Sequence, residues 1–419
     1  MSASQVMLAP KYSSRPVPAV SPGSNAAGRE GLAGLALAVF LVSGSWSLAR
    51  VAGVEPMAIW QPRVWAVLVL VALAFMPSRV RRVGGRTALG AELAWLGFSL
   101  VSITWAPELA LAEDQAIELG LLIAVAIALH RLARTSRVER IATALRHGLL
   151  VLLLGLAAVA LLGGVGGMGG RAAVLGGGPN VFGRNMGVLA LLALERALGF
   201  GSATTTRPRP FALPVWSWVA CVAAGLVALS GSRGAMISTF IAAGLLLVLG
   251  RARLSRRLAV ALGGLGLFAA LLVLTPLGER VIASFASRVL DLLVADRYVS
   301  GRDQIYVIAL EGGARQPIIG HGLASFAAAT PWPYAHNLAL DAWFETGAIG
   351  VALLGLYLGR GAQLLGRLGA GGRELWVALA LLIFVGAQFS GGRYDARALL
   401  VCVALALALP RPQPSRRSP

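Results

Sequence analysis

Charged residues and cysteines are both scarce in this sequence. Only 13% of the 419 residues are charged, whereas 57% are hydrophobic, and the mean hydropathy is +0.76. That balance excludes an ordinary soluble domain and is typical of a polytopic membrane protein. The two cysteines, Cys221 and Cys402, stand in apolar runs, so we expect buried thiols and no disulfide framework.

Motifs that bind metals or nucleotides are also missing. The sequence has no Cys/His spacing of the zinc type and no glycine-rich phosphate loop. Basic residues outnumber acidic ones by 37 to 18, which gives a formal net charge of +19. No basic face with interleaved aromatic residues is visible, so we interpret the charge as basic flanks of cytoplasmic helix ends. We therefore expect no nucleic-acid partner.

Apolar windows long enough for membrane helices recur along the chain. They lie at 31–49, 57–76, 88–105, 114–130, 144–163, 180–199, 213–231, 234–250, 257–276, 337–359, 374–390 and 395–410. The sequence therefore predicts an all-α polytopic membrane protein with about twelve transmembrane helices embedded in the lipid bilayer. The segment before the first window, 1–30, is rich in Ser, Pro and Ala and lacks the features of a signal peptide. We expect a disordered cytoplasmic tail there and a second tail at 411–419.

Basic residues predict how the spans are oriented. An even number of spans places both termini on one side, and roughly two thirds of the Lys and Arg residues fall on that side. Both termini are therefore predicted to be cytoplasmic, with helices 1–9 in residues 31–276 and helices 10–12 in residues 337–410. The opposite side receives the one long connection, residues 277–336, and connections of this length are more often functional than idle.

The long segment 277–336 has helical patterns of its own. Apolar residues recur at helical spacing over 281–292, which predicts an amphipathic helix on the membrane surface. Ser300 and Asp303 have the spacing of a capping box that opens a second helix. Arg302 then falls in the first turn, where the helix dipole disfavours a cation, so we expect an anion to compensate it.

Two further arginines stand at the ends of apolar spans. Arg233 lies in a very short turn between two spans, and Arg184 lies in the first turns of the window 180–199. A charged side chain at membrane depth costs about 2.5–3.5 kcal/mol, so it normally faces a partner or a wet cavity. Arginines near helix ends can instead extend to the interface, and the sequence leaves both readings open.

A polar stripe begins the tenth window. Asn337, Asp341 and Glu345 are spaced four residues apart, so they share one helix face, and His336 heads that face at its water-facing end. The two carboxylates could pair structurally with arginines such as the two named above. Pairing is compatible with a functional role, because such pairs can shape a site.

His336 is the best candidate for a catalytic base. His130 and His147 fall on the cytoplasmic side, and His321 sits in a glycine turn. Arginine forks bind phosphate oxygens in pairs, and a neutral imidazole accepts a proton near pH 7. The pattern therefore predicts an extracytoplasmic site for a membrane-embedded substrate that carries phosphate, such as the diphosphate of a lipid carrier.

Four motifs carry a resemblance to a known family. They are PNVFGRN (179–185), LSGSRGA (229–235), SGRDQIYVIAL with QPIIGHGLASF (300–326), and AHNLALDAWFETGAIG (335–350). In this order and spacing they resemble the O-antigen ligase and polymerase superfamily of bacterial membrane glycosyltransferases. The resemblance implies a GT-C-like fold. It also implies transfer of a preassembled glycan from undecaprenyl diphosphate to an acceptor, without a metal or another cofactor.

The resemblance also implies residue roles. His336 matches the family's histidine before Asn and would deprotonate or orient the acceptor hydroxyl. Arg233 and Arg302 match the arginines of the Ser-Arg-Gly and Ser-Gly-Arg motifs and would hold the donor diphosphate. The supporting candidates are Asn180, Arg184, Asn337, Asp341 and Glu345. No Asp-x-Asp metal motif is present, since the acidic pair of DLLVAD (291–296) has the wrong spacing.

Several members of the superfamily share these motifs. Twelve spans, the loop 277–336 and no visible soluble domain favour a ligase of the bacterial inner membrane. Such a ligase joins O-antigen to lipid A–core at the periplasmic face. An O-antigen repeat-unit polymerase and a protein O-oligosaccharyltransferase are alternatives. A transporter of a lipid-linked anion is the non-enzymatic alternative, and the need for a proton acceptor is what separates transfer from transport.

Overall fold

A computed structural model describes residues 24–43, 61–77, 88–163, 171–175, 177–199, 212–249, 252–286, 302–363 and 373–409. The regular structure of these residues is helical, with fifteen α-helices. The first seven are α1 (Ser24–Val42), α3 (Pro62–Phe75), α4 (Leu89–Val101), α5 (Leu109–Thr135), α6 (Val138–Leu162), α7 (Pro179–Leu198) and α8 (Ala212–Leu229). The others are α9 (Arg233–Leu249), α10 (Leu254–Leu274), α11 (Pro276–Phe285), α13 (Arg302–Arg315), α14 (Ser325–Ala329), α15 (Leu338–Ala362), α16 (Glu374–Gly386) and α17 (Arg397–Ala408).

The predicted windows agree with this arrangement. Each of the twelve overlaps one helix of the described residues, from α1 to α10 and from α15 to α17, and the predicted surface helices correspond to α11 and α13. By length and composition α5, α6, α10 and α15 can each cross a membrane, and shorter apolar helices accompany them. The all-helical membrane architecture is confirmed in this sense, whereas the number of crossings stays a prediction.

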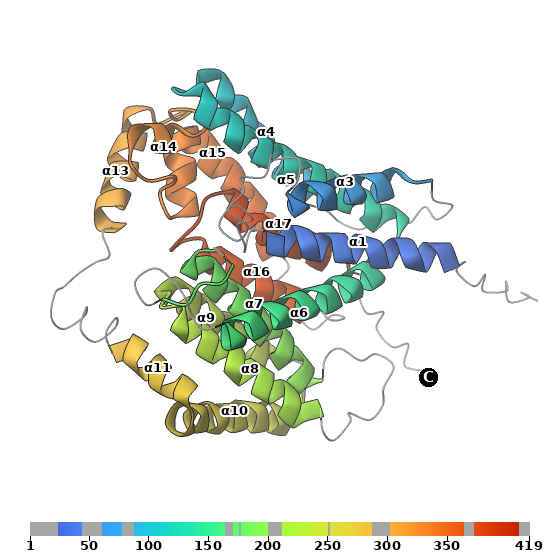
Figure 1. Ribbon diagram of the computed structural model, residues 1–419. Coiled ribbons are helices and arrows are strands. Elements are labelled where there is room, and N and C mark those ends of the chain that lie inside the picture. The colour runs from blue at the N-terminus through green and yellow to red at the C-terminus, as the bar shows by residue number, and fades with distance from the viewer. Residues whose placement is uncertain are drawn as a thin grey trace, which may run out of the picture.

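The helices pack around α16, which contacts α7, α9 and α17. On one side α1 lies against α6 and α3, and α5 lies against α3 and α4 (Figure 1). α15 packs on α4 and carries α13 and α14, so these three helices form one end of the molecule (Figure 1). The candidate residues lie where this end meets the beginnings of α7 and α9 and the segment before α17.

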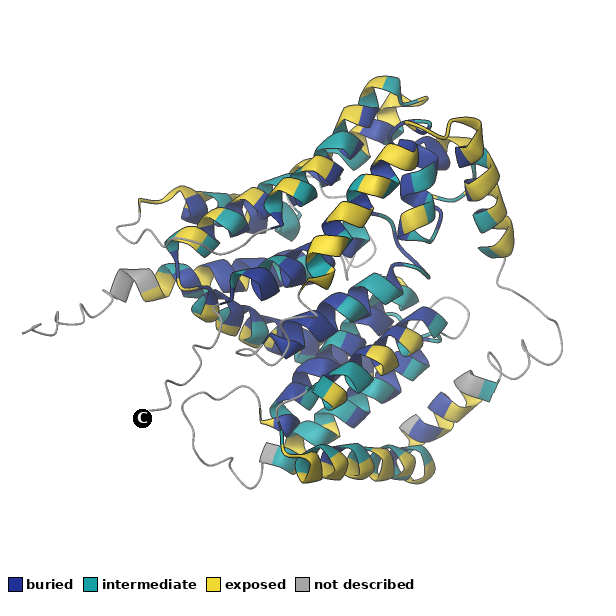
Figure 2. Ribbon diagram, turned by 180° about the vertical axis from the view of Figure 1, so that it is seen from behind, coloured by how far each residue is buried: buried dark blue, intermediate teal, exposed yellow. Residues whose placement is uncertain are grey.

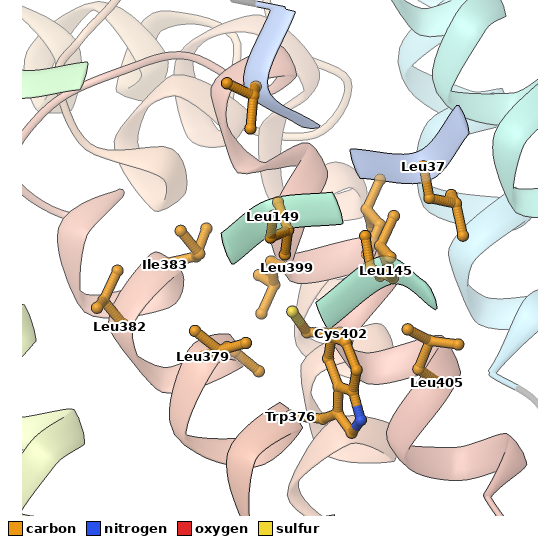
Figure 3. Packing of buried hydrophobic residues seen from close by; sticks show 14 of the residues in the cluster. Leu37, Leu145, Leu149, Trp376, Leu379, Leu382, Ile383, Leu399, Cys402 and Leu405 are labelled. Atoms are coloured by element: carbon orange, nitrogen blue, oxygen red, sulfur yellow. The ribbon is translucent and has the colours of Figure 1, made fainter. Parts of the chain in front are cut away.

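The core is built from small and branched apolar side chains. Leu37, Leu145 and Leu149 meet Trp376 and the rest of α16 and α17 in one continuous cluster (Figure 3). α16 is apolar on every face, which explains why it is enclosed by other helices. Both cysteines are buried and free, as expected.

The outer helices face a different environment. Large apolar side chains stand exposed along them, including Phe240 at 81% and Leu274 at 78%. α10 is largely exposed at the edge of the molecule, whereas α7 and α16 are buried (Figure 2). Exposed apolar helix faces of this kind fit contact with lipid chains rather than water.

Two boundaries differ from the sequence-based expectation. α1 begins at Ser24, so part of the predicted tail 1–30 is helical. Glu30 explains the extension, because its carboxylate accepts a hydrogen bond from the Arg137 amide and pairs with Arg140. α5 begins at Leu109, five residues before the predicted window 114–130.

Some expectations concern residues outside the described ranges. These are the terminal tails up to residue 23 and from 410 onwards, the apolar positions 289 and 292, and Ser300 of the capping box. The beginning of the long segment agrees with the prediction. α11 starts after Thr275, whose hydroxyl accepts a hydrogen bond from the Gly278 amide at 3.1 Å, and its Val281 is buried.

Candidate active site

His336 sits in a loop held by hydrogen bonds on both sides. The amide of Ala335 donates to Oδ1 of Asp341 at 3.2 Å. Oδ1 of Asn337 accepts from the first free amides of α15 at 3.0 and 3.1 Å, as an N-cap does. His336 itself has φ of 55°, a left-handed conformation that is uncommon outside glycine. Because its neighbours are anchored, this conformation is imposed by the surrounding structure.

The imidazole of His336 is kept neutral by its surroundings. Its ring packs edge-on against Tyr334, with the centroids 4.7 Å apart. Burial lowers the pKa of His336 from its ordinary value, and the cation of Arg302 lowers it further, against a smaller opposing effect of Asp395. Nδ1 is buried and has no hydrogen-bond partner among the described residues, so protonation would leave a charged N–H unsatisfied. A neutral ring that accepts a proton at Nε2 carries its own hydrogen on this Nδ1.

Arg302 and Arg233 are each the first residue of a helix. α13 begins at Arg302 and α9 at Arg233, where the helix dipole disfavours a cation. Burial lowers the pKa of Arg302, and the cation of Arg233 also lowers it, against an opposing effect of Tyr306. No ion pair joins either side chain to a carboxylate of the described residues. The pair thus forms a positively charged position that an anion would stabilise.

Tyr334 links this charged position to the histidine. Its pKa is raised to about 12, chiefly by burial, with a smaller opposing effect from the cations of Arg184 and Arg302. The ring thus stays a neutral phenol at ordinary pH. Sequence reasoning did not select Tyr334, although it stands only two positions before His336.

Arg233 is held in place by a close-packed turn. The amide of Ala235 donates to Oγ of Ser232 at 3.3 Å, so Ser232 helps to cap α9. A Cβ on Gly183 of α7 would approach Oγ of Ser230 to 2.5 Å, and one on Gly234 would approach Phe389 equally closely. Only glycine fits at these contacts, and they bring α7 and the segment before α17 against the turn.

Arg184 and Asn180 are engaged in structural bonds rather than facing open space. Arg184 is buried and donates to the carbonyl of Ser390 at 3.3 Å. Asn180 donates to Oγ of Ser390 and accepts from Arg171, both at 2.9 Å. Arg171 in turn donates to the carbonyl of Ser230 at 3.0 Å. This network fixes the turn that carries Arg233, which makes Asn180 and Arg184 supporting residues.

The carboxylate stripe has a partner that sequence reasoning missed. Arg393, from the segment between α16 and α17, lies 3.8 Å from Asp341 through Nε and also contacts Glu345 through Nη2. All three side chains are buried. The carboxylates thus pair with an arginine, as one reading of the sequence allowed, but the partner is Arg393 and neither Arg184 nor Arg233. Nothing in the local sequence pattern links a residue of the GGRYDAR stretch to α15.

Asp341 therefore has two structural roles, one through each carboxylate oxygen. It balances the charge of Arg393 with Oδ2 and holds the amide next to His336 with Oδ1. Within the stripe, Asp341 and Glu345 are buried against Arg393, and Asn337 and Asp341 hold the histidine loop through hydrogen bonds. Removal of Arg393, or of the carboxylates that face it, would strongly destabilise the protein, because a buried charge would be left without a partner.

α15 is broken at Gly347, which has φ of 61°. The amides of His321 and Gly322 donate to the carbonyls of Phe344 and Glu345 at 3.0 and 2.9 Å. Nε2 of His321 also lies 2.8 Å from the carbonyl of Gly312. The glycine turn thus satisfies backbone groups that the break leaves free. His321 is structural, which agrees with its exclusion as a base.

Comparison with known sequences identifies a family for part of the chain. Residues 218–355, about a third of the chain, match the sequence model of the O-antigen ligase family. This segment is an O-antigen ligase domain. No curated protein matches the chain. The resemblance inferred from the four motifs is confirmed over the matched residues.

The O-antigen ligase domain contains His336, Arg233 and Arg302 together with the stripe on α15. Arg184, Asn180 and Arg393 lie outside it and join it only through tertiary contacts. The family performs membrane glycan transfer of the O-antigen ligase or polymerase type, and lipid-linked glycans are its substrates. Within the described residues, no three side chains of His, Cys, Asp or Glu come together as a metal site.

Proposed function

We propose that this protein transfers a preassembled O-antigen glycan from undecaprenyl diphosphate to a lipid A–core sugar at the periplasmic face of the inner membrane. The observations that support the proposal are the imidazole of His336, whose pKa is lowered by burial and by Arg302, and the guanidiniums of Arg302 and Arg233, which pair with no described carboxylate. An anion would balance the charge of the guanidiniums, and the imidazole can accept the proton of a hydroxyl group. Glycan transfer from a diphosphate needs both.

The chemistry follows from these groups. Arg233 and Arg302 bind the donor diphosphate and stabilise the negative charge that develops as the glycosyl C–O bond breaks. Nε2 of His336 accepts the proton of the acceptor hydroxyl, whose oxygen forms the new bond to the anomeric carbon from the opposite face. The configuration inverts, and undecaprenyl diphosphate leaves as an anion. No general acid and no metal ion are needed for this leaving group.

The proposal includes a topology. Twelve spans would place both termini in the cytoplasm, with the histidine loop and the beginnings of α9 and α13 at the periplasmic side. The basic residues of the sequence support this orientation. The exposed apolar faces of the outer helices support a bilayer around them.

A second candidate is transport of a lipid-linked anion. The break of α15 at Gly347, with two carboxylates just before it, is the observation that favours it. Discontinuous helices with charged residues build substrate sites in many transporters. A transporter, however, has no use for a base, so the role of His336 separates the two.

The deciding experiment combines two substrates with two variants. Purified protein with undecaprenyl-diphosphate glycan and lipid A–core should yield a covalent glycolipid. His336→Ala and His336→Asn should lose that product by at least about 100-fold, because general base catalysis is typically worth this much, while donor binding persists. His336→Asn matters because Asn tolerates the left-handed backbone and keeps the loop intact.

The matched control is His147→Ala, since His147 is exposed on α6 and far from the loop in sequence. It should retain full activity. Full activity in both His336 variants would contradict the base assignment. A product that joins donor glycans to one another, or to protein, would instead identify the polymerase or the protein-glycosylating alternative.

A further inference from the structure

A cavity lies beside the histidine loop. Its volume is about 510 Å³, within the size range of small-molecule sites. Its walls come from the start of α3, the first turns of α5, the histidine loop and the segment before α17, through Gln61, Gln115, Tyr334 and Asp395 among others. These segments are far apart in the sequence, so only the fold brings them together.

The charge of this cavity is opposite to that of the arginine position. Its walls contain the carboxylates of Asp114, Glu118, Asp341 and Asp395 but only two guanidiniums. Those two are already balanced, Arg63 by Glu118 at 3.0 Å and Arg393 by the stripe on α15. Asp395 is paired with Arg397 at 3.9 Å, which leaves Asp114 as the lining carboxylate without an ion pair among the described residues. An excess of carboxylate repels a diphosphate. The cavity is therefore unsuited to the anionic part of a donor.

The remaining polar groups suit a neutral ligand rich in hydroxyls. Gln61 and Gln115 line the cavity, and their side-chain amides make no hydrogen bond within the described part of the chain. Arg393 is only 6% exposed, yet its Nη1 has no hydrogen-bond partner among the described residues. A buried guanidinium N–H without an acceptor is costly, and a ligand hydroxyl oxygen would satisfy it.

Tyr334 joins the cavity to the reaction centre. It lines the cavity and packs its ring against His336. Asp341 lines the same cavity and bonds the amide preceding the histidine. A ligand in the cavity would therefore contact the ring that packs against the imidazole.

We propose that this cavity binds a neutral sugar unit of one of the two substrates, using the amides of Gln61 and Gln115 and Nη1 of Arg393. The inference rests on the proposed function and adds that the site is divided. Arginines hold the diphosphate on one side of Tyr334, and amides and carboxylates hold sugar hydroxyls on the other. The sugar belongs either to the acceptor or to the first residue of the donor glycan.

The test separates these sources with Gln115→Leu and Gln61→Leu. Each variant removes a hydrogen-bonding amide and keeps the side-chain bulk. The KM of one sugar substrate should rise about threefold to tenfold per lost hydrogen bond, with kcat little changed. A rise confined to the acceptor KM identifies an acceptor sugar, and a rise confined to the donor KM identifies the donor's first sugar. Glu113→Gln is the control, because Glu113 is exposed on the same helix and is not part of the cavity wall.

Binding provides a second readout that does not depend on turnover. Saturation-transfer NMR on the purified full-length protein would use lipid-free core oligosaccharide and lipid-free donor glycan as probes, with pyrophosphate as the anionic probe. Gln115→Leu should weaken one oligosaccharide and leave pyrophosphate unchanged. If the wild-type protein forms no glycolipid, the proposed function fails, and the NMR result alone decides about the cavity. Unchanged KM values together with unchanged oligosaccharide binding in both variants would overturn the inference.

Discussion

The surroundings of Arg302 disfavour its positive charge. Arg302 begins a helix, is half-buried and lies near a second cation, and all three circumstances disfavour its charge. A protein retains such a residue at a cost, and an anionic ligand offsets that cost. The planar fork of arginine adds directional hydrogen bonds that a point charge does not supply.

Replacing that fork should reveal its role. Arg302→Lys keeps the charge but loses bidentate bonding, so the KM for the lipid-linked donor should rise about tenfold. The KM for the acceptor should stay close to that of the wild type in the same two-substrate assay. Arg315→Lys, at the other end of α13, is the control. A donor KM that does not change would argue against a diphosphate clamp.

The pH dependence of the reaction should report the environment of His336. Its pKa is lowered, chiefly by burial and then by Arg302, so the ring is neutral at pH 7 and kcat/KM should fall only on the acid side of 6.5. Asp395 acts in the opposite direction and raises that pKa. Asp395→Asn should therefore shift the acid limb to lower pH, as measured from full pH profiles of kcat/KM. A shift to higher pH would show that another group controls the limb.

At the scale of single elements, the break in α15 is the most informative feature. The helix carries its polar stripe in the first two turns, ends that part at Gly347, and then continues to Ala362. The turn before α14 fills the gap with backbone hydrogen bonds from His321 and Gly322. The break thus locks α13, α14 and α15 into one unit that presents Arg302 and His336 from neighbouring positions.

Gly347→Ala should destabilise the protein. The residue has φ of 61°, and a Cβ would approach the carbonyl oxygen of Ile318 to 2.5 Å. We expect a loss of about 1–3 kcal/mol in the free energy of unfolding, from backbone strain and the clash. Gly355→Ala is the matched control in the same helix, because a Cβ there meets nothing and helix propensity should add up to about 1 kcal/mol. Unfolding in detergent would compare them, and equal stability of the two variants would contradict the interpretation of the break.

At the scale of the whole molecule, the candidate site depends on three chain regions. The O-antigen ligase domain supplies the imidazole and both arginines, whereas Arg184 of α7 and Arg393 before α17 brace them from outside. The first turns of α5 and the start of α3 close the neighbouring cavity. A fragment restricted to the matched residues would therefore lack the groups that hold its own site.

The topology can be tested with added cysteines, since both native ones are buried. Ser255 at the start of α10 and Ala329 at the end of α14 are exposed. In intact spheroplasts a membrane-impermeant maleimide should label Ala329→Cys and leave Ser255→Cys unlabelled until the membrane is opened. The reverse pattern would contradict the proposed orientation.

Much of this protein follows from the sequence alone. Each of the twelve apolar windows overlaps one helix of the described residues, because a membrane helix must satisfy its backbone internally and show lipid an apolar surface. The motifs correctly identify the family over 218–355. They also select His336, Arg233 and Arg302 as candidates. The cation of Arg302 lowers the pKa of His336, and the cation of Arg233 lowers the pKa of Arg302.

Only the tertiary structure decided what the carboxylates do and where the cavity lies. Asp341 and Glu345 are paired with Arg393, about fifty residues further along the chain, and no periodicity encodes such a pairing. The break at Gly347 depends on a turn from another part of the chain, in which the amides of His321 and Gly322 donate hydrogen bonds to backbone carbonyls of α15. The local sequence pattern indicates which helix faces are apolar. Contacts between distant segments arise only when the helices pack together, and the candidate site is assembled from such contacts.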